Sequence, residues 1–246
     1  MKISTIVKNS VNNLLSILNL YIQKKHPGVD SDDQLVKILA HFKINYIIDV
    51  GANTGQFSET IFSTDFKGEI ISFEPLSSAH KVLLKNSSNY LNWKVYKRCA
   101  IGNIDGNINI NISKNSVSSS ILPVSKTHIK ASNDSKYVGS ETAEIFKLDT
   151  VFANNIEIEN KNIFLKIDTQ GYEWDVLLGA DLVLNHTLVI LCELSYANLY
   201  NGQKQWLEIV LKLKALGFEL WAIQYGLTEP HSGRSLQSDG IFYKKQ

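Results

Sequence analysis

Short apolar runs alternate with segments of helical periodicity along most of the chain. The apolar runs lie at 45–50, 68–75, 93–102, 162–168, 187–195, 218–223 and 240–245, and helical patterns lie at 55–63, 76–86, 171–184 and 202–216. Strand-like and helical segments that alternate in this way predict a parallel sheet with helices on both faces, an α/β fold. The runs "YIIDV" and "LVILCEL" are almost continuously apolar, which is typical of strands covered on both sides. The last two runs have no helix between them, so we expect an antiparallel pair there.

The first part of the chain has a different pattern. Apolar residues recur at helical spacing from Ile3 to Ile22, and a second helical pattern covers 32–42. We therefore expect an N-terminal helical extension at 1–42 and a main domain at 43–246. The first helix either packs on the domain or docks on a protein partner or a membrane surface. The second alternative is suggested by its basic residues, which are Lys2, Lys8, Lys24 and Lys25.

The same segment lacks the apolar block and cleavage site of a signal peptide. No stretch of the sequence approaches the roughly 20 apolar residues that span a bilayer. We therefore expect a cytoplasmic protein, peripheral at the inner membrane surface if the first helix docks there.

An insertion at about 103–147 interrupts the alternation. It begins with Asp105-Gly106 before alternating isoleucines, which predicts a hairpin strand, and "SETAEIFKL" looks like its return strand. The long Ser-rich middle predicts a lid over the site, because loops longer than about 12–15 residues inside a domain are usually functional or disordered. Ser118, Ser119 and Ser120 offer hydroxyls to an acceptor molecule. His128 is a candidate base, although a histidine in a polar loop is more often simply solvated.

Composition narrows the choice of partners. The 246 residues suit one large domain or a domain with a cap, with 44% hydrophobic and 20% charged residues. A formal net charge of +1 gives no basic face, so we expect no nucleic-acid partner. Cys99 and Cys192 lie in apolar strand-like runs, and we expect both to be reduced core residues.

Candidate cofactor residues follow the first two strands. Open parallel sheets bind ligands at the carboxyl ends of their strands. After the first strand, a glycine at position 51 allows a tight turn and a glycine at 55 allows close helix packing. Glu74 ends the second strand, where a carboxylate can accept both hydroxyls of a ribose, and the alternative is an exposed acid without a role. The third run ends in small residues that leave room for a flat ring. The candidate set is Asp49, Gly51, Asn53, Gly55, Phe57, Glu74, Pro75, Cys99, Ala100 and Asp168.

Candidate catalytic residues follow the fourth and fifth strands. Asp168 ends the fourth strand, Lys166 precedes it, Glu173 follows in the next helix, and Glu193 lies near the end of the fifth. We expect these side chains to converge beside the nucleoside, although Lys166 and Glu193 each have a purely structural alternative as an ion-pair partner and a turn cap. The aromatic residues nearby either form a platform for a sugar ring or pack in the core. They are Tyr172, Trp174, Tyr196 and Tyr200.

Several segments together resemble the FkbM family of S-adenosylmethionine-dependent methyltransferases. The resemblance covers about residues 45–245 and is carried by "IIDVGANTGQFSETI", "IISFEPLSSAHKVL", "AIGNIDGNINI", "SSSILP", "KLDTVF", "IFLKIDTQGYEWDVLLGA", "ELSYANLYNGQ" and "SDGIFYKK". It implies a class I (Rossmann-like) methyltransferase fold with a seven-stranded, mostly parallel sheet and an antiparallel final strand. It also implies methyl transfer to an oxygen, often a hydroxyl of a sugar or polyketide.

The resemblance gives roles to the candidate residues. Asp49 or a nearby carbonyl would hold the amino-acid portion of S-adenosylmethionine, Glu74 the ribose, and the 99–101 backbone the adenine. A sugar hydroxyl needs a proton acceptor, for which Asp168 is the first candidate and Glu193 the second. Both carboxylates could also bind a divalent metal, which the sequence does not establish.

We therefore expect an O-methyltransferase whose acceptor is a small molecule or a glycan, such as a polysaccharide or a glycosylated intermediate. One alternative is a nucleotide-dependent oxidoreductase, which is disfavoured because the first turn lacks G-x-G-x-x-G. Another is a non-catalytic module that binds a nucleoside.

Overall fold

The computed structural model describes residues 5–18, 20, 22, 30–155 and 158–245. Residues 1–38 and 39–246 form two compact units. The first unit contains helix α1, Thr5–Leu15, and a following 3-10 turn, Ser16–Leu18, and helix α2, Ser31–His41, crosses the boundary between the units. Both helices lie where apolar spacing predicts them. Ile3, Lys2, Lys24 and Lys25 lie outside the described residues, and the predicted docking of the first helix stays a prediction.

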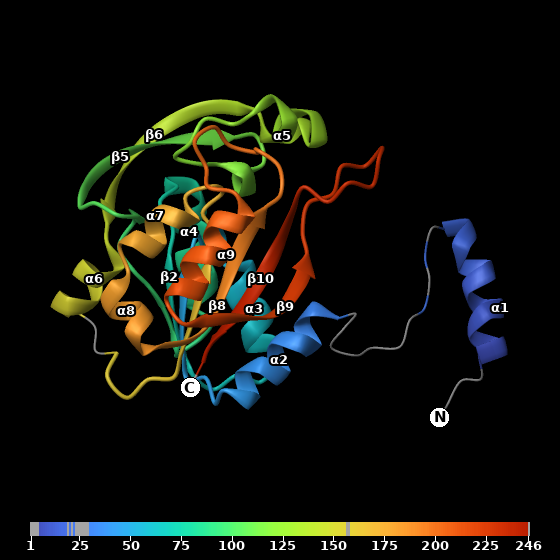
Figure 1. The fold of residues 1–246 in the computed structure, drawn as a ribbon, viewed down its shortest axis with the longest axis horizontal. Helices are drawn as coiled ribbons and strands as arrows, with labels where there is room; N and C mark the ends of the chain where they lie inside the picture. The colour runs from blue at the N-terminus through green and yellow to red at the C-terminus, as the bar shows by residue number, and fades with distance from the viewer. Residues whose placement is uncertain (1–4, 19, 21, 23–29, 156–157, 246) are drawn as a thin grey trace. The chain divides into compact units, whose positions relative to one another are not determined.

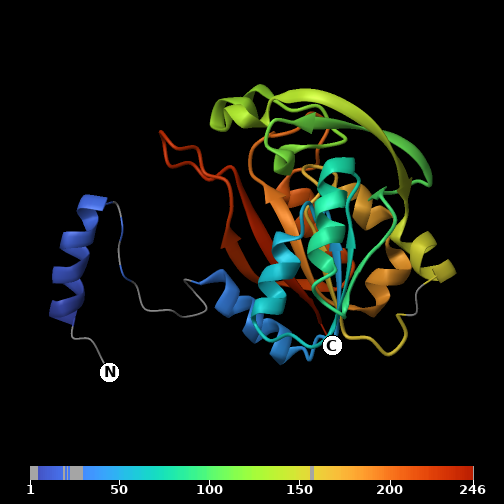
Figure 2. The ribbon, with the colours of Figure 1, turned by 180° about the vertical axis from the view of Figure 1, so that it is seen from behind.

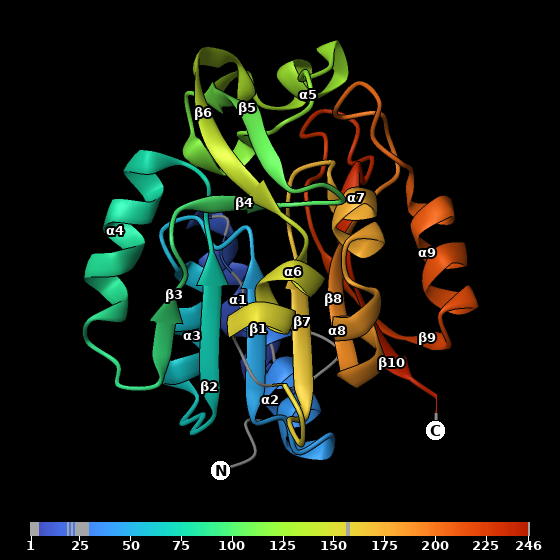
Figure 3. The ribbon, with the colours of Figure 1, turned by 90° about the vertical axis from the view of Figure 1, so that its left-hand side faces the viewer.

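The main sheet of the second unit has seven strands in the order β3-β2-β1-β7-β8-β10-β9 (Figure 3). The strands are β1 Tyr46–Val50, β2 Glu69–Phe73, β3 Trp93–Val95, β7 Ile163–Ile167, β8 Thr187–Ser195, β9 Phe218–Tyr225 and β10 Gln237–Lys244. Neighbours from β3 to β8 are parallel, and β10 is antiparallel to both β8 and β9. The predicted mostly parallel sheet with an antiparallel final strand is therefore confirmed, and β10 lies between β8 and β9.

Helices cover both faces of this sheet. Adjacent residues of a strand point to opposite faces, and Ile47 and Ile48 of β1 are both fully buried. Figure 2 shows α3 and α4 in front of the sheet, and Figure 1 shows α7, α8 and α9 in front of its other face. The helices are α3 Gln56–Ser63, α4 Ser77–Ser87, α6 Leu148–Asn155, α7 Glu173–Leu178, α8 Asp181–His186 and α9 Trp206–Ala215.

The insertion forms a second sheet over the carboxyl ends of the central strands (Figures 1 and 3). Its order is β4-β6-β5, with β4 Cys99–Ile101, β5 Gly106–Ser113 and β6 Tyr137–Phe146. The pairing of β5 with β6 confirms the predicted hairpin strands, although Asp105-Gly106 does not close a hairpin between them. The Ser-rich middle is partly helical and contains α5, Lys126–Ala131.

Two predicted elements differ from the structure, and one helix was not predicted. The run 93–102 is two strands, because the chain leaves the main sheet after Val95 and joins the insertion sheet at Cys99. The predicted helix 171–184 is divided into α7 and α8 at Gly179. A Cβ at Gly179 would lie 2.0 Å from the carbonyl oxygen of Gly102, so only glycine permits this close approach. Helix α6 lies where no helix was predicted.

Candidate active site

A cavity of about 310 Å³ lies at the carboxyl ends of β1, β2 and β7, where the insertion also contributes to its wall. This volume is at the lower end of the range typical of small-molecule sites. Among the predicted cofactor residues, those that line the cavity are Gly51, Asn53, Phe57, Glu74, Pro75, Cys99, Ala100 and Asp168. The structure therefore brings residues from four separate segments to one site.

The turn after β1 depends on two glycines for different reasons. Gly51 has φ +78°, and a Cβ there would lie 1.8 Å from the carbonyl oxygen of Asp168, so glycine lets the ends of β1 and β7 approach closely. Gly55 has φ +99°, and a Cβ there would lie 2.5 Å from the Trp93 ring. Gly55 therefore packs the start of α3 on its neighbours, as predicted, and does not line the cavity.

Glu74 is held rigidly in the cavity wall. Glu74 is only 4% exposed, and its two carboxylate oxygens accept the backbone N–H groups of Asn53 and Leu76, each at 2.8 Å. Burial raises the pKa of Glu74 to about 7, against the opposing effect of the two N–H groups. Each oxygen keeps a second lone pair, so this carboxylate can accept hydroxyl donors from a ligand.

The wall beside Glu74 includes Cys99 and Ala100 of β4. Burial raises the pKa of Cys99 to about 12, so its thiol is neutral. Cys99 and Cys192 are both buried and free, as expected from their apolar surroundings in the sequence.

Asp49 has a different position from the predicted one. It is fully buried and does not line the cavity, so it does not make the direct donor contact predicted for it. Its Oδ2 accepts the hydroxyls of Ser58 and Ser72 at 3.0 and 3.3 Å. Its Oδ1 lies 3.0 Å from the ammonium nitrogen of Lys166. Asp49 is thus the buried counterion of Lys166.

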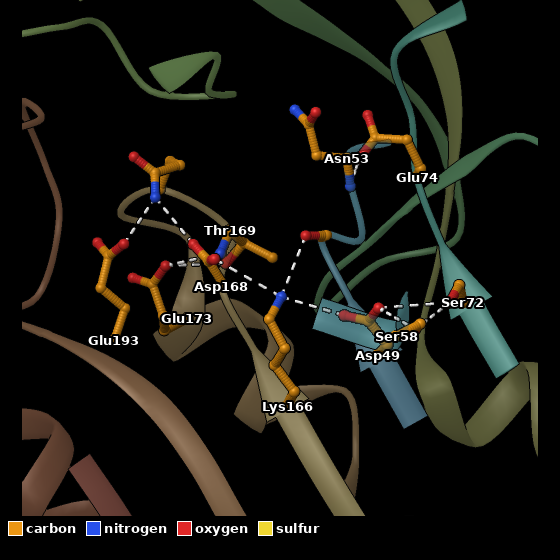
Figure 4. Close-up of polar contacts among 12 residues, drawn as sticks. Asp49, Asn53, Ser58, Ser72, Glu74, Lys166, Asp168, Thr169, Glu173 and Glu193 are labelled. Atoms are coloured by element: carbon orange, nitrogen blue, oxygen red, sulfur yellow. Dashed lines mark hydrogen bonds and ion pairs between the residues drawn. The ribbon is translucent and has the colours of Figure 1, made fainter. Parts of the chain in front are cut away.

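Lys166 joins the end of β7 to the turn after β1 (Figure 4). Its Nζ donates to the carbonyl oxygen of Gly51 at 3.2 Å and lies 3.6 Å from Oδ2 of Asp168. Burial alone would lower the pKa of Lys166, but the carboxylates of Asp49 and Asp168 outweigh it and the net pKa is raised. Lys166 therefore places a permanent positive charge in the cavity wall, beside Asp168.

Asp168 is the one predicted catalytic carboxylate that lines the cavity, and its side chain is 37% exposed. Its Oδ1 accepts the side-chain amide of Gln170 at 2.8 Å. The same amide nitrogen donates to Oε2 of Glu193 at 2.6 Å. Sequence reasoning overlooked Gln170, because a neutral residue in a loop is not selected by a search for acids at strand ends.

Glu193 and Glu173 do not line the cavity, which corrects the prediction that all four catalytic candidates converge on the ligand. Oε1 of Glu173 accepts the N–H groups of Thr169 and Gly171, each at 3.0 Å, so Glu173 fixes the loop after β7. Burial and the carboxylate of Asp168 raise the pKa of Glu173 to about 7, even though the backbone N–H groups oppose this shift. Burial and the neighbouring carboxylates of Glu173, Asp168 and Asp239 raise the pKa of Glu193 well above its ordinary value.

The side-chain amide of Gln170 bridges Asp168 and Glu193, the two carboxylates that are the sequence's candidates for binding a divalent metal. The Gln170 amide donates to both Asp168 and Glu193, so these two carboxylates are held by a hydrogen-bond donor. Within the described part of the chain, the structure has no group of three or more His, Cys, Asp or Glu side chains that could hold a metal ion. We therefore derive no role for a metal.

The four aromatic candidates pack elsewhere. None of Tyr172, Trp174, Tyr196 and Tyr200 lines the cavity, and Tyr200 is fully buried. His128 is also buried and makes an edge contact with Tyr200 at 5.1 Å between ring centroids. His128 is therefore not solvated, because α5 packs against Tyr200. Tyr172, Trp174 and Tyr200 pack in hydrophobic clusters, which is the second of the two alternatives for the aromatic residues.

The insertion contributes both polar and apolar side chains to the cavity. Ser119 and Ser120 line it, as do Ile110 and Ile121, whereas Ser118 does not. The Ser120 hydroxyl donates to the carbonyl oxygen of Gln170 at 2.6 Å. The insertion therefore covers the site and is hydrogen-bonded directly to the loop after β7.

These residues fit a nucleoside. A buried carboxylate with free lone pairs suits a ribose, and the small residues of β4 leave space for a flat ring. A seven-stranded sheet with a reversed strand between β8 and β9, and a ligand cavity at the ends of β1 and β2, defines a class I methyltransferase.

Comparison with known families agrees with this class. The model of the "Methyltransferase FkbM domain" matches residues 49–220. The chain belongs to this family and is an S-adenosylmethionine-dependent methyltransferase, which excludes the oxidoreductase alternative. No curated protein matches the chain.

Solved methyltransferase structures are similar at low identity. One is an rRNA methylase from Streptococcus thermophilus, with 10% identity, a TM-score of 0.48, and coverage of 92% of this chain and 100% of that chain. Another is an S-adenosylmethionine-dependent methyltransferase from Clostridium acetobutylicum, with 9% identity, a TM-score of 0.47, and coverage of 97% and 99%. Likenesses this distant carry no information on the acceptor.

The described residues contain no helix with the length and apolar character needed to cross a bilayer.

Proposed function

We propose that the protein transfers a methyl group from S-adenosylmethionine to a hydroxyl oxygen of a sugar or glycosylated acceptor. The observation that carries the proposal is the pairing of a partly exposed Asp168 with the buried ammonium of Lys166 in the cavity wall. A carboxylate in this position can accept the proton that a sugar hydroxyl loses on methylation.

The donor supplies an electrophilic methyl group when bound. Glu74 would hold the ribose hydroxyls, and the backbone of the turn after β1, opened by Gly51, would border the rest of the donor. The ammonium of Lys166, 3.6 Å from Oδ2 of Asp168, would orient this carboxylate toward the acceptor. The insertion excludes water, which helps a displacement that depends on alignment.

Two features favour a polar acceptor. The wall near the end of β7 carries Asp168, Thr169 and Gln170, whereas the wall from the insertion and β4 carries Ile110, Ile121 and Ala100. The apolar wall suits the adenine, and the polar wall is left for a hydroxylated acceptor. A small molecule or a glycan fits this arrangement, and the predicted absence of a nucleic-acid partner stays a prediction.

The test is transfer of labelled methyl from S-adenosylmethionine to fractionated glycans and their precursors. We expect label in a base-stable ether on a sugar, and about 10²–10⁴-fold slower labelling with Asp168→Asn under the same conditions. Transfer to nitrogen, to RNA or to a protein would contradict the proposal. Donor binding without transfer to any fraction would instead favour a binding module.

A further inference from the structure

The cavity opens to solvent where the insertion meets helix α3. Of the described residues that line the cavity, the two that are exposed are Gln56 at the start of α3 and Val117 in the insertion, which is 51% exposed. The other lining residues are buried or half-buried. The side chains of Gln56 and Val117 therefore mark the way into the cavity.

Next to this opening, one pair of side chains joins the insertion to the turn after β1. The hydroxyl oxygen of Ser116 lies 3.3 Å from both Oδ1 and Nδ2 of Asn53. Both residues are half-buried. A single hydrogen bond between side chains that water can reach contributes little net free energy, so this bond can break and form again without wider unfolding.

Asn53 is the fixed member of the pair. Its backbone has φ +48°, a conformation that asparagine tolerates better than most residues, and its Oδ1 accepts the N–H of Thr54 at 2.9 Å. Its own N–H donates to Oε2 of Glu74 at 2.8 Å (Figure 4). The pair with Ser116 thus lies directly beside the carboxylate proposed to hold the ribose.

The insertion is held more firmly on the other side of the opening. The carbonyl oxygen of Ser118 accepts the hydroxyl of the fully buried Tyr200 at 3.1 Å. The hydroxyl of Ser120 donates to the carbonyl oxygen of Gln170 at 2.6 Å. Residues 118–120 are therefore anchored to the loops after β7 and β8, whereas residue 116 depends on the bond to Asn53.

We propose that residues 115–117 form a flap over the donor, hinged at 118–120, and that the bond between Ser116 and Asn53 closes it. The inference rests on the proposed placement of the donor in this cavity. The donor enters and leaves while the flap is open, so loss of the bond raises the open fraction. A bond between two protein groups does this equally with and without the donor. The rates of association and dissociation therefore rise together, and the Kd stays the same.

The test measures binding of S-adenosylhomocysteine to the immobilised full chain by surface plasmon resonance. Ser116→Ala should raise the association and dissociation rate constants each by roughly 2- to 12-fold, the worth of one hydrogen bond, with an unchanged Kd. In an Asn53→Gly background, Ser116→Ala should have no further effect on either rate, because its partner is already absent. Glycine is used at position 53 because it accepts a positive φ.

Ser119→Ala is the matched control. It also removes a hydroxyl that lines the cavity, but this hydroxyl accepts the N–H of Ser113, at 3.0 Å and within the insertion, so both rates should match the wild type. Wild-type rates for Ser116→Ala would overturn the inference. A higher Kd with an unchanged association rate would also overturn it, because Ser116 would then contact the donor itself. No methyl acceptor is used, so the result is independent of whether the proposed sugar methylation is found.

Discussion

Glu74→Ala tests the cofactor side of the cavity. In the wild type, Glu74 is 4% exposed, and its carboxylate accepts hydrogen bonds from the backbone N–H groups of Asn53 and Leu76. The substitution removes the acceptor for the ribose hydroxyls of the donor. It also leaves two backbone donors without their partner, in the protein with and without ligand.

The expected loss can be worked from these contacts. A buried hydrogen-bonding group that loses its partner costs about 1–3 kcal/mol, and the ribose hydroxyls lose theirs only in the complex. At about 1.4 kcal/mol for each factor of ten, the Kd for S-adenosylmethionine should rise roughly 5- to 140-fold. The unpaired N–H groups reduce stability in both states and do not add to this figure.

Isothermal titration calorimetry with S-adenosylmethionine measures the change. Glu141→Ala is the matched control, since Glu141 also accepts a backbone N–H, from Ser77 at 2.7 Å, but does not line the cavity. The control should bind the donor like the wild type. A folded Glu74→Ala protein with wild-type affinity would refute the placement of the ribose.

Three further predictions concern pH, turnover and stability. The pKa of Glu74 is about 7, and only its ionised form accepts two hydroxyls, so the affinity for the donor should fall as the pH drops through about 7. Glu74→Gln should make the donor affinity nearly independent of pH, and a flat wild-type profile would argue against this reasoning. Asp168→Asn should lower turnover by about 10²–10⁴-fold in the radiolabel assay, so near-wild-type rates would remove Asp168 as the base. Lys166→Met leaves the fully buried Asp49 without its counterion and should cost about 3–5 kcal/mol in urea unfolding. The control Lys161→Met breaks a partly exposed pair and should cost about 0–1 kcal/mol, and equal losses would contradict the reasoning.

The strand pattern of the main sheet follows closely from the sequence. Continuous apolar runs that end in acids place β1, β2, β7 and β8, because buried parallel strands must be apolar on both faces. The division of 93–102 between two sheets could not be predicted in this way. Both halves are apolar and β-prone, and contacts with β2 and β6, distant in the sequence, decide which sheet each joins.

The site was predictable where it depends on strand ends. Glu74 and Asp168 line one cavity because the carboxyl ends of β2 and β7 lie at the same edge of the sheet. The rule does not say where a side chain points, so Asp49 and Glu193 are buried beside the cavity instead of lining it. Gln170 forms hydrogen bonds with Glu193 and Tyr200, which lie 23 and 30 positions further along the chain, so no local sequence pattern identifies it.

The central claim is that a single donor molecule fills this cavity with its ribose on Glu74 and its sulfur toward Asp168. A crystal structure with S-adenosylhomocysteine tests it most directly. The account predicts both ribose hydroxyls within hydrogen-bond distance of the Glu74 carboxylate, and the sulfur on the side of the cavity that Asp168 and Lys166 line. A ligand bound outside this cavity, or bound inside it with the ribose away from Glu74, would contradict the account.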